Sequence, residues 1–148
     1  MITIIENDYF IEAVLLNKKE VKQYLHHHPQ KKKCKVLVLN FNTFPFFIIE
    51  NGFGNFLYYS NKNKVIDYIK NVDLWKIKTA TKASFKISAN LETESEITTG
   101  LALTIYKLTE PYTSEFKNKD SMGLIDHYHI DQENIMEIKN GNIDNFNI

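Results

Sequence analysis

The chain has 148 residues, of which 43% are hydrophobic and 13% aromatic. This composition is typical of a globular protein with one core, and it excludes a disordered or low-complexity chain. The formal net charge is zero, and the single cysteine excludes an internal disulfide framework. We expect one α+β domain over residues 1–148. We also expect a cytoplasmic protein, because no apolar run is long enough to span a membrane and the first residues lack signal-peptide features.

The charges are distributed unevenly along the chain. Residues 1–86 carry 14 lysines and 7 acidic residues, whereas residues 87–148 carry 4 lysines and 11 acidic residues. All 18 basic residues are lysine, so the chain has no guanidinium group to bind phosphate or guanine through two hydrogen bonds. Nucleic-acid binding is an alternative function. It would use the lysines of residues 1–86 to contact phosphates and the aromatic rings to stack on bases. We expect no nucleic-acid partner and no membrane association.

The first elements are a strand and a helix. Residues 2–5 predict a short strand. Asn17, with Glu20 three residues later, is a capping-box pattern that predicts the start of a helix. Pro29 ends this helix because proline cannot continue the hydrogen-bond ladder.

The helix ends at three consecutive histidines. On a helix, His26, His27 and His28 point about 100° apart, so they cannot bind one ion together. We interpret them as a solvated helix end, where histidine interacts favourably with the helix dipole. Cys34 opens the next strand, and we interpret it as a small core residue.

A glycine-containing turn over residues 51–55 separates two apolar strands, residues 44–50 and 55–60, and a third strand over residues 34–42 precedes them. We expect Lys35–Ser60 to form the central strands of one sheet. The residues expected to be buried there are Val36, Val38, Phe47, Ile49 and Leu57.

The second half of the chain is expected to be mainly strand. Residues 64–73 fit either a helix or a strand, and residues 97–109 fit both but favour a strand. The region over residues 111–123 has loop composition, and Asn140–Gly141 is a candidate hairpin turn. The further expected strands are residues 74–79, 82–92, 124–130 and 134–148. Strands outnumber helices without βαβ alternation, so we expect a mainly antiparallel sheet with one or two helices.

A His-x-His pattern near the C-terminus resembles the metal-binding motif of cupin-type enzymes. On a strand, His127, His129 and Asp131 share one face, and Glu133 follows. Cupins use a further histidine from a later motif, and no histidine follows Glu133. We therefore expect no metal, no cofactor and no enzymatic activity. A small metal-dependent β-barrel enzyme that uses His127 and His129 remains the alternative.

Three acidic residues, Glu92, Glu94 and Glu96, share one face if their strand continues. Like charges at this spacing repel each other unless they are solvated or face a cation. We interpret them as a solvated edge, with an acidic docking surface as the alternative.

Residues Phe44–Asn61 read FPFFIIENGFGNFLYYSN. They resemble the central strand–turn–strand of immunity proteins from bacterial polymorphic-toxin and contact-dependent growth inhibition systems, in which an apolar strand leads through glycines to a strand ending near a Tyr-Ser pair. The resemblance implies a small cytoplasmic inhibitor that binds and neutralises a cognate toxin domain, often a nuclease, as a 1:1 complex. Acidic side chains can occupy the basic substrate groove of such a nuclease. The residues expected to bind the toxin are Glu92, Glu94, Glu96, Tyr106, Glu110, Tyr112 and Glu115.

Overall fold

The computed structural model describes residues 1–8, 10–28, 33–51, 55–72, 101–113, 125–143 and 146–148. They form a mainly antiparallel α+β fold, as the sequence predicts. The strands form two four-stranded sheets, and the described residues include three helices, where the sequence predicted one sheet with one or two helices. Sheet A has the order β3-β1-β2-β7, and sheet B has the order β5-β4-β6-β8. Sheet A consists of β1 (Thr3–Glu6), β2 (Ile11–Leu15), β3 (Lys35–Val38) and β7 (Tyr112–Thr113). Sheet B consists of β4 (Phe46–Glu50), β5 (Phe56–Tyr59), β6 (Leu101–Leu108) and β8 (His127–Asp131).

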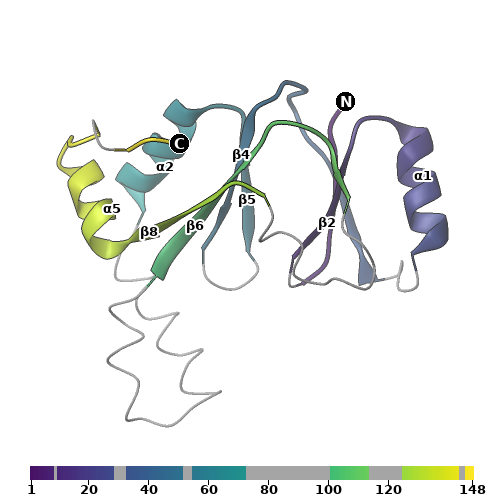
Figure 1. Ribbon diagram of the computed structural model, residues 1–148, viewed down its shortest axis with the longest axis horizontal. Coiled ribbons are helices and arrows are strands. Elements are labelled where there is room, and N and C mark those ends of the chain that lie inside the picture. The colour runs from purple at the N-terminus through teal and green to yellow at the C-terminus, as the bar shows by residue number, and fades with distance from the viewer. Residues whose placement is uncertain (9, 29–32, 52–54, 73–100, 114–124, 144–145) are drawn as a thin grey trace, which may run out of the picture.

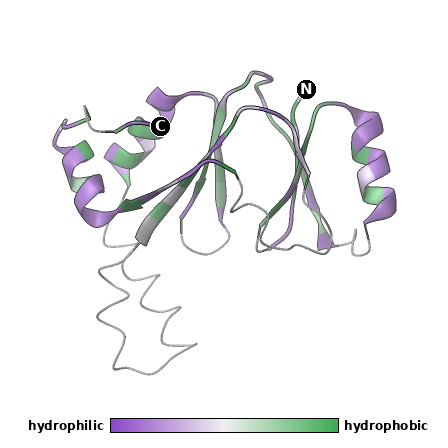
Figure 2. Ribbon diagram, viewed as in Figure 1, coloured by the Kyte–Doolittle hydropathy of each residue, from purple (hydrophilic) through white to green (hydrophobic). Residues whose placement is uncertain are grey.

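The described helices cover the outer faces of the two sheets. Helix α1 (Lys18–His27) packs on sheet A, and helices α2 (Lys62–Asn71) and α5 (Gln132–Lys139) pack on sheet B. The layers therefore run from α1 through the two sheets to α2 and α5 (Figure 1). Each helix carries both hydrophilic and hydrophobic residues (Figure 2), which suits a helix with one face on a sheet.

Strand β4 is buried on both faces, which explains its uninterrupted apolar sequence. Phe46 and Ile48 belong to the core between the two sheets. Phe47 and Ile49 point the other way, into the core beneath α2 and α5. This alternation follows from the period of two in a strand.

The structure resolves two alternatives that the sequence left open. Residues within 64–73 are helical as part of α2, because Asn61 caps the helix by accepting the Lys64 backbone N–H at 3.0 Å. Val65 and Ile69 are buried on its inner face. The described part of residues 97–109 is strand β6, as the sequence favoured.

The capping prediction for α1 is confirmed at Asn17, whose side chain accepts the Glu20 backbone N–H at 2.9 Å. The Glu20 carboxylate accepts the backbone N–H of Leu16 at 3.2 Å. In a capping box it would accept the N–H of the N-cap residue, Asn17, so this bond is one residue out of place. The helix ends at His27, before Pro29, as expected.

The predicted strand over residues 134–148 is wrong, because this segment begins with helix α5. The Asp131 side chain accepts the Asn134 N–H, and the Asn134 side chain binds back to the Asp131 N–H, so a reciprocal capping box starts the helix. Ile135 and Ile138 are buried three residues apart on one helix face. Gly141 follows the C-cap with φ +87°, so it ends a helix and is not part of a hairpin turn.

The prediction that Lys35–Ser60 forms the centre of one sheet is also wrong. Strand β3 is a terminal strand of sheet A, whereas β4 and β5 belong to sheet B. Val36 and Val38 are 44% and 62% exposed, because α1 does not cover this edge. Phe47 and Ile49 are buried as predicted, and Leu57 is half-buried.

Other predictions lie wholly or partly outside the described residues. The predicted strands over 74–79 and 82–92 are outside them, as are residues 114–123 of the predicted loop. The described start of that loop contains the short strand β7. None of the helices in the described part of the chain combines the length and apolar character that crossing a bilayer requires.

Candidate functional site

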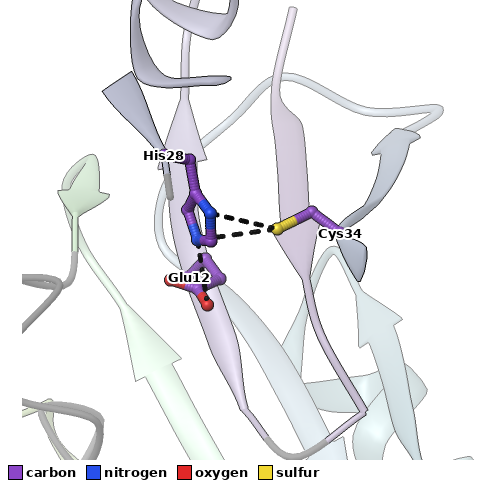
Figure 3. Close-up of side chains that lie close together, drawn as sticks. All are labelled: Glu12, His28 and Cys34. Atoms are coloured by element: carbon purple, nitrogen blue, oxygen red, sulfur yellow. Dashed lines mark hydrogen bonds and ion pairs between the residues drawn. The ribbon is translucent and has the colours of Figure 1, made fainter. Parts of the chain in front are cut away.

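Three side chains with metal-binding or acid–base chemistry meet beneath the C-terminal end of α1. They are Glu12 in β2, His28 at the C-cap of α1 and Cys34 just before β3. Figure 3 shows the three side chains pointing toward one another. Nε2 of His28 lies 3.3 Å from Oε1 of Glu12 and 3.6 Å from Sγ of Cys34.

A β-bulge aims Glu12 into this cluster. Across the β1–β2 ladder, Ile5 pairs with Ala13 and Glu6 pairs with Ile11, so Glu12 is the extra residue on its strand. Such a bulge turns a side chain away from the regular alternation of the strand. The Glu12 and His28 side chains are each only 7% exposed. The bulge therefore places a carboxylate inside the layer between sheet A and α1.

Two further side chains fix the orientation of the Glu12 carboxylate. The Asn7 side-chain amide donates to Oε1 at 2.6 Å, and the Tyr24 hydroxyl donates to Oε2 at 3.0 Å. The Tyr24 ring also lies 5.7 Å from the His28 ring, between centroids. Both carboxylate oxygens are thus held by hydrogen bonds, and one oxygen also faces the imidazole.

The geometry does not match a nucleophilic Cys-His-carboxylate triad. In such a triad the thiol and the carboxylate contact opposite nitrogens of the imidazole. Here Nε2 of His28 is the ring nitrogen nearest Cys34 and also contacts Glu12, while Nδ1 lies 4.0 Å from Sγ. Burial raises the pKa of the Cys34 thiol, and the nearby Glu12 charge raises it further. Both effects favour the thiol over the nucleophilic thiolate.

The sequence interpretation of the histidine run is correct at two positions and wrong at the third. His26 and His27 are exposed at the helix end, as expected. His28 is buried, because the chain turns there and directs its ring toward Glu12. Cys34 is partly covered and packs with the small core beneath α1, in agreement with its interpretation as a core residue.

The cluster does not form a local sequence motif, because Glu12 and His28 are 16 residues apart and His28 and Cys34 are 6 residues apart. One signal was present in the sequence. Glu12 lies within the apolar strand Ile11–Leu15, whose residues are all buried. A carboxylate in a buried strand needs a polar partner, so the position of Glu12 predicts a polar side chain packed against it.

The second pair of histidines lies on the edge strand of sheet B. His127 and His129 are exposed, and their ring centroids are 5.1 Å apart. Nδ1 of His127 donates to the Ile125 carbonyl at 2.9 Å, and Nδ1 of His129 lies 3.3 Å from the Thr104 hydroxyl. Among the described residues, no third donor joins this pair in a group that could hold an ion. Asp131 instead caps helix α5.

The structure describes three of the seven residues expected to bind a toxin. Tyr106 is half-buried, and its hydroxyl donates to Oε1 of Glu50 at 3.3 Å. Tyr112 is also half-buried and packs, like Tyr106, against the core between the sheets. Glu110 is exposed between β6 and β7. The four others, Glu92, Glu94, Glu96 and Glu115, lie outside the described residues.

Comparisons of this chain with protein-family models, with curated proteins and with solved structures found no match.

Proposed function

We propose that this protein binds a bacterial toxin domain as a 1:1 complex and neutralises it. The observation that carries the proposal is a partly exposed strip across sheet B, called here the β8 strip. Its members are Glu50, Thr104, Tyr106, His127 and His129. The strand register places Glu50 opposite Thr104, Thr104 opposite His129, and Tyr106 opposite His127, so all five side chains share one face of the sheet.

The β8 strip is buried at Thr104 and becomes exposed toward the β8 edge of sheet B. Farther along β4, the same face packs on sheet A through Phe46 and Ile48. At the β8 edge, however, His127 and His129 are exposed and Tyr106 is half-buried. This part of the inner face is therefore accessible to a partner protein.

The composition of the strip suits a protein interface. Partly exposed tyrosine side chains combine a large apolar ring with a polar tip, and they recur among the residues that dominate binding energy. The Tyr106 ring lies 6.2 Å from the His127 ring, between centroids, and its hydroxyl is held by Glu50. These neighbours restrict the motion of the Tyr106 ring before binding, which lowers the entropic cost of association.

The resemblance over Phe44–Asn61 supports a toxin as the partner. This segment contains β4 and β5, which pair as antiparallel neighbours, and it contributes Glu50 to the strip. Glu110 adds an exposed carboxylate after the end of β6. Acidic groups beside an aromatic anchor suit the basic substrate groove of a nuclease.

Co-expression tests the proposal. If a toxin domain is encoded beside this gene, cells that produce that domain should survive only when the protein is also produced, and the absence of such a gene would count against the proposal. The double variant His127→Ala/His129→Ala should protect less well, whereas His26→Ala/His27→Ala should protect fully because those histidines lie on α1, on the opposite side of the layers. Death of cells that produce both wild-type protein and toxin would contradict the proposal.

A further inference from the structure

We propose that Glu12, His28 and Cys34 bind a zinc ion that fastens α1 to sheet A. This inference is independent of the proposed toxin binding. It differs from the expectation drawn from the sequence, which predicted no metal after considering the histidine run at 26–28 and the pair His127 and His129. Among the described residues, these three form a group of metal-ligand side chains whose donor atoms all lie within 4.8 Å of one another.

The two donor-atom distances that involve His28 fit a tetrahedral zinc site, and the Glu12 oxygen and the Cys34 sulfur lie within 4.8 Å of each other. Zinc lies about 2.3 Å from sulfur, about 2.1 Å from imidazole nitrogen and about 2.0 Å from carboxylate oxygen, which places nitrogen about 3.6 Å from sulfur and about 3.4 Å from oxygen. In this protein, Nε2 of His28 lies 3.6 Å from Sγ of Cys34 and 3.3 Å from Oε1 of Glu12. Sγ is also close to Nδ1, at 4.0 Å. The sulfur thus lies beside the ring and is near both nitrogens. Zinc binding therefore requires the imidazole ring to rotate, so that the Nε2 lone pair points between the sulfur and the oxygen.

The types of donor favour zinc over other common cations. A thiolate and an imidazole are poor ligands for magnesium and calcium, which prefer oxygen donors, and good ligands for zinc. A carboxylate and a thiolate together would balance the two positive charges of the ion. This balance matters because Glu12 and His28 are buried, where an uncompensated charge is costly.

The surroundings of Glu12 resemble the outer shell of a metal site. The carboxylate receives hydrogen bonds from Asn7 and Tyr24. Such hydrogen bonds orient a metal ligand, and their loss typically lowers metal affinity by about 10–100-fold. Three protein ligands leave one tetrahedral position for a water molecule.

The position of the cluster indicates a structural role. Its ligands come from β2, the end of α1 and the residue before β3, so one ion would join the helix to two strands of sheet A. Helix α1 has no fully buried residue, and among the described residues the buried members of the core beneath it are Ile5, Ala13 and Leu15. A helix with so little buried apolar surface gains much from an additional cross-link.

Cobalt titration of the metal-free, full-length protein without an affinity tag tests the inference. Cobalt(II) replaces zinc and reports thiolate ligation through a sulfur-to-metal charge-transfer band. We expect one equivalent of cobalt to produce this band and one equivalent of zinc to abolish it. Cys34→Ser and His28→Ala should lose the band, and Tyr24→Phe should weaken binding about 10-fold. The matched controls His27→Ala and His127→Ala/His129→Ala should titrate like the wild-type protein.

A hydrogen-exchange measurement covers the possibility that a ligand variant fails to fold. Zinc should slow amide exchange over Val21–Leu25 in the wild-type protein but not in Cys34→Ser, which retains the size of the side chain. The inference is overturned if the charge-transfer band is absent or substoichiometric in the wild-type protein. It is also overturned if the band persists in Cys34→Ser, or if zinc leaves exchange in α1 unchanged.

Discussion

Tyr58 of sheet B donates a partly buried hydrogen bond to the Glu6 carboxylate of sheet A. This bond joins residues 52 positions apart in the chain and crosses the interface between the two sheets. Burial, followed by the hydrogen bond to Glu6 and its charge, raises the pKa of Tyr58 far above its ordinary value. The hydroxyl therefore remains protonated, and a hydrogen-bond donor, at neutral pH.

We predict that Tyr58→Phe destabilises the protein by about 1–3 kcal/mol, because it leaves a partly buried carboxylate without its donor. Urea denaturation followed by circular dichroism measures this loss. Tyr59→Phe is the control, since Tyr59 lies on the opposite face of β5 and packs against Tyr68 of α2. Equal stability of Tyr58→Phe and the wild-type protein would show that the bond between the sheets is dispensable.

Glu50 gives a prediction about pH. Burial raises the pKa of its carboxyl group above the ordinary value of 4.5, although the hydrogen bond from Tyr106 opposes the rise. A raised pKa means that the folded state holds the proton more tightly than the unfolded state does. Ionisation of Glu50 therefore lowers the free energy of unfolding as pH rises from 4.5 through the folded-state pKa.

Glu50→Gln should consequently raise the free energy of unfolding at about pH 7 and change it less at about pH 4, where the wild-type carboxyl is largely protonated. The measurement is urea denaturation of both proteins at the two pH values. Glu110→Gln, at an exposed position, controls for the removal of one negative charge. A larger stabilisation at the lower pH would refute the assigned direction of the shift.

The core assignment is tested at Phe47, which is 4% exposed. Phe47→Asp buries an unpaired charge and should cost several kcal/mol, enough to prevent soluble folding. Val38→Asp places the same side chain on the exposed edge of sheet A and should leave the protein soluble and folded. The assay is the soluble yield together with the circular-dichroism spectrum, and a folded Phe47→Asp protein would contradict the packing of sheet B.

The capping box of α5 supplies a further prediction. Asp131→Ala removes the acceptor for the Asn134 backbone N–H, which lies 2.8 Å away. Loss of an N-cap costs about 1 kcal/mol. Asp131→Asn preserves an acceptor at this position and should retain most of the stability in thermal denaturation. Equal effects of the two substitutions would mean that the helix does not depend on this cap.

The elements with clear local signals were predictable from the sequence. Asn17 identified the start of α1, and the apolar runs identified β4 and β5. Helix α5 was missed because Asp131 ends a strand and also caps the following helix. The exposure of β3 was missed because its apolar residues resemble those of a central strand, and only the sheet order reveals that it is an edge.

The candidate metal cluster could not be predicted from spacing because two features of the folded chain create it. The bulge in β2 turns Glu12 toward α1, and the end of α1 turns His28 away from its two exposed neighbours. Pro29 indicates where α1 ends, and the apolar strand around Glu12 indicates a need for a polar partner, but neither signal shows that the two side chains meet. For His127 and His129 on β8 the reverse holds. Their spacing is a recognisable metal-binding pattern, but no third ligand lies near them among the described residues.

Direct binding of the purified protein to the purified toxin domain tests the proposed neutralisation. We expect a single 1:1 complex in size-exclusion chromatography with light scattering. We also expect Tyr106→Ala to speed dissociation at least about tenfold, as for an aromatic anchor at the centre of an interface. Separate elution of the two proteins at micromolar concentrations would contradict the claim that this protein neutralises the toxin by binding it.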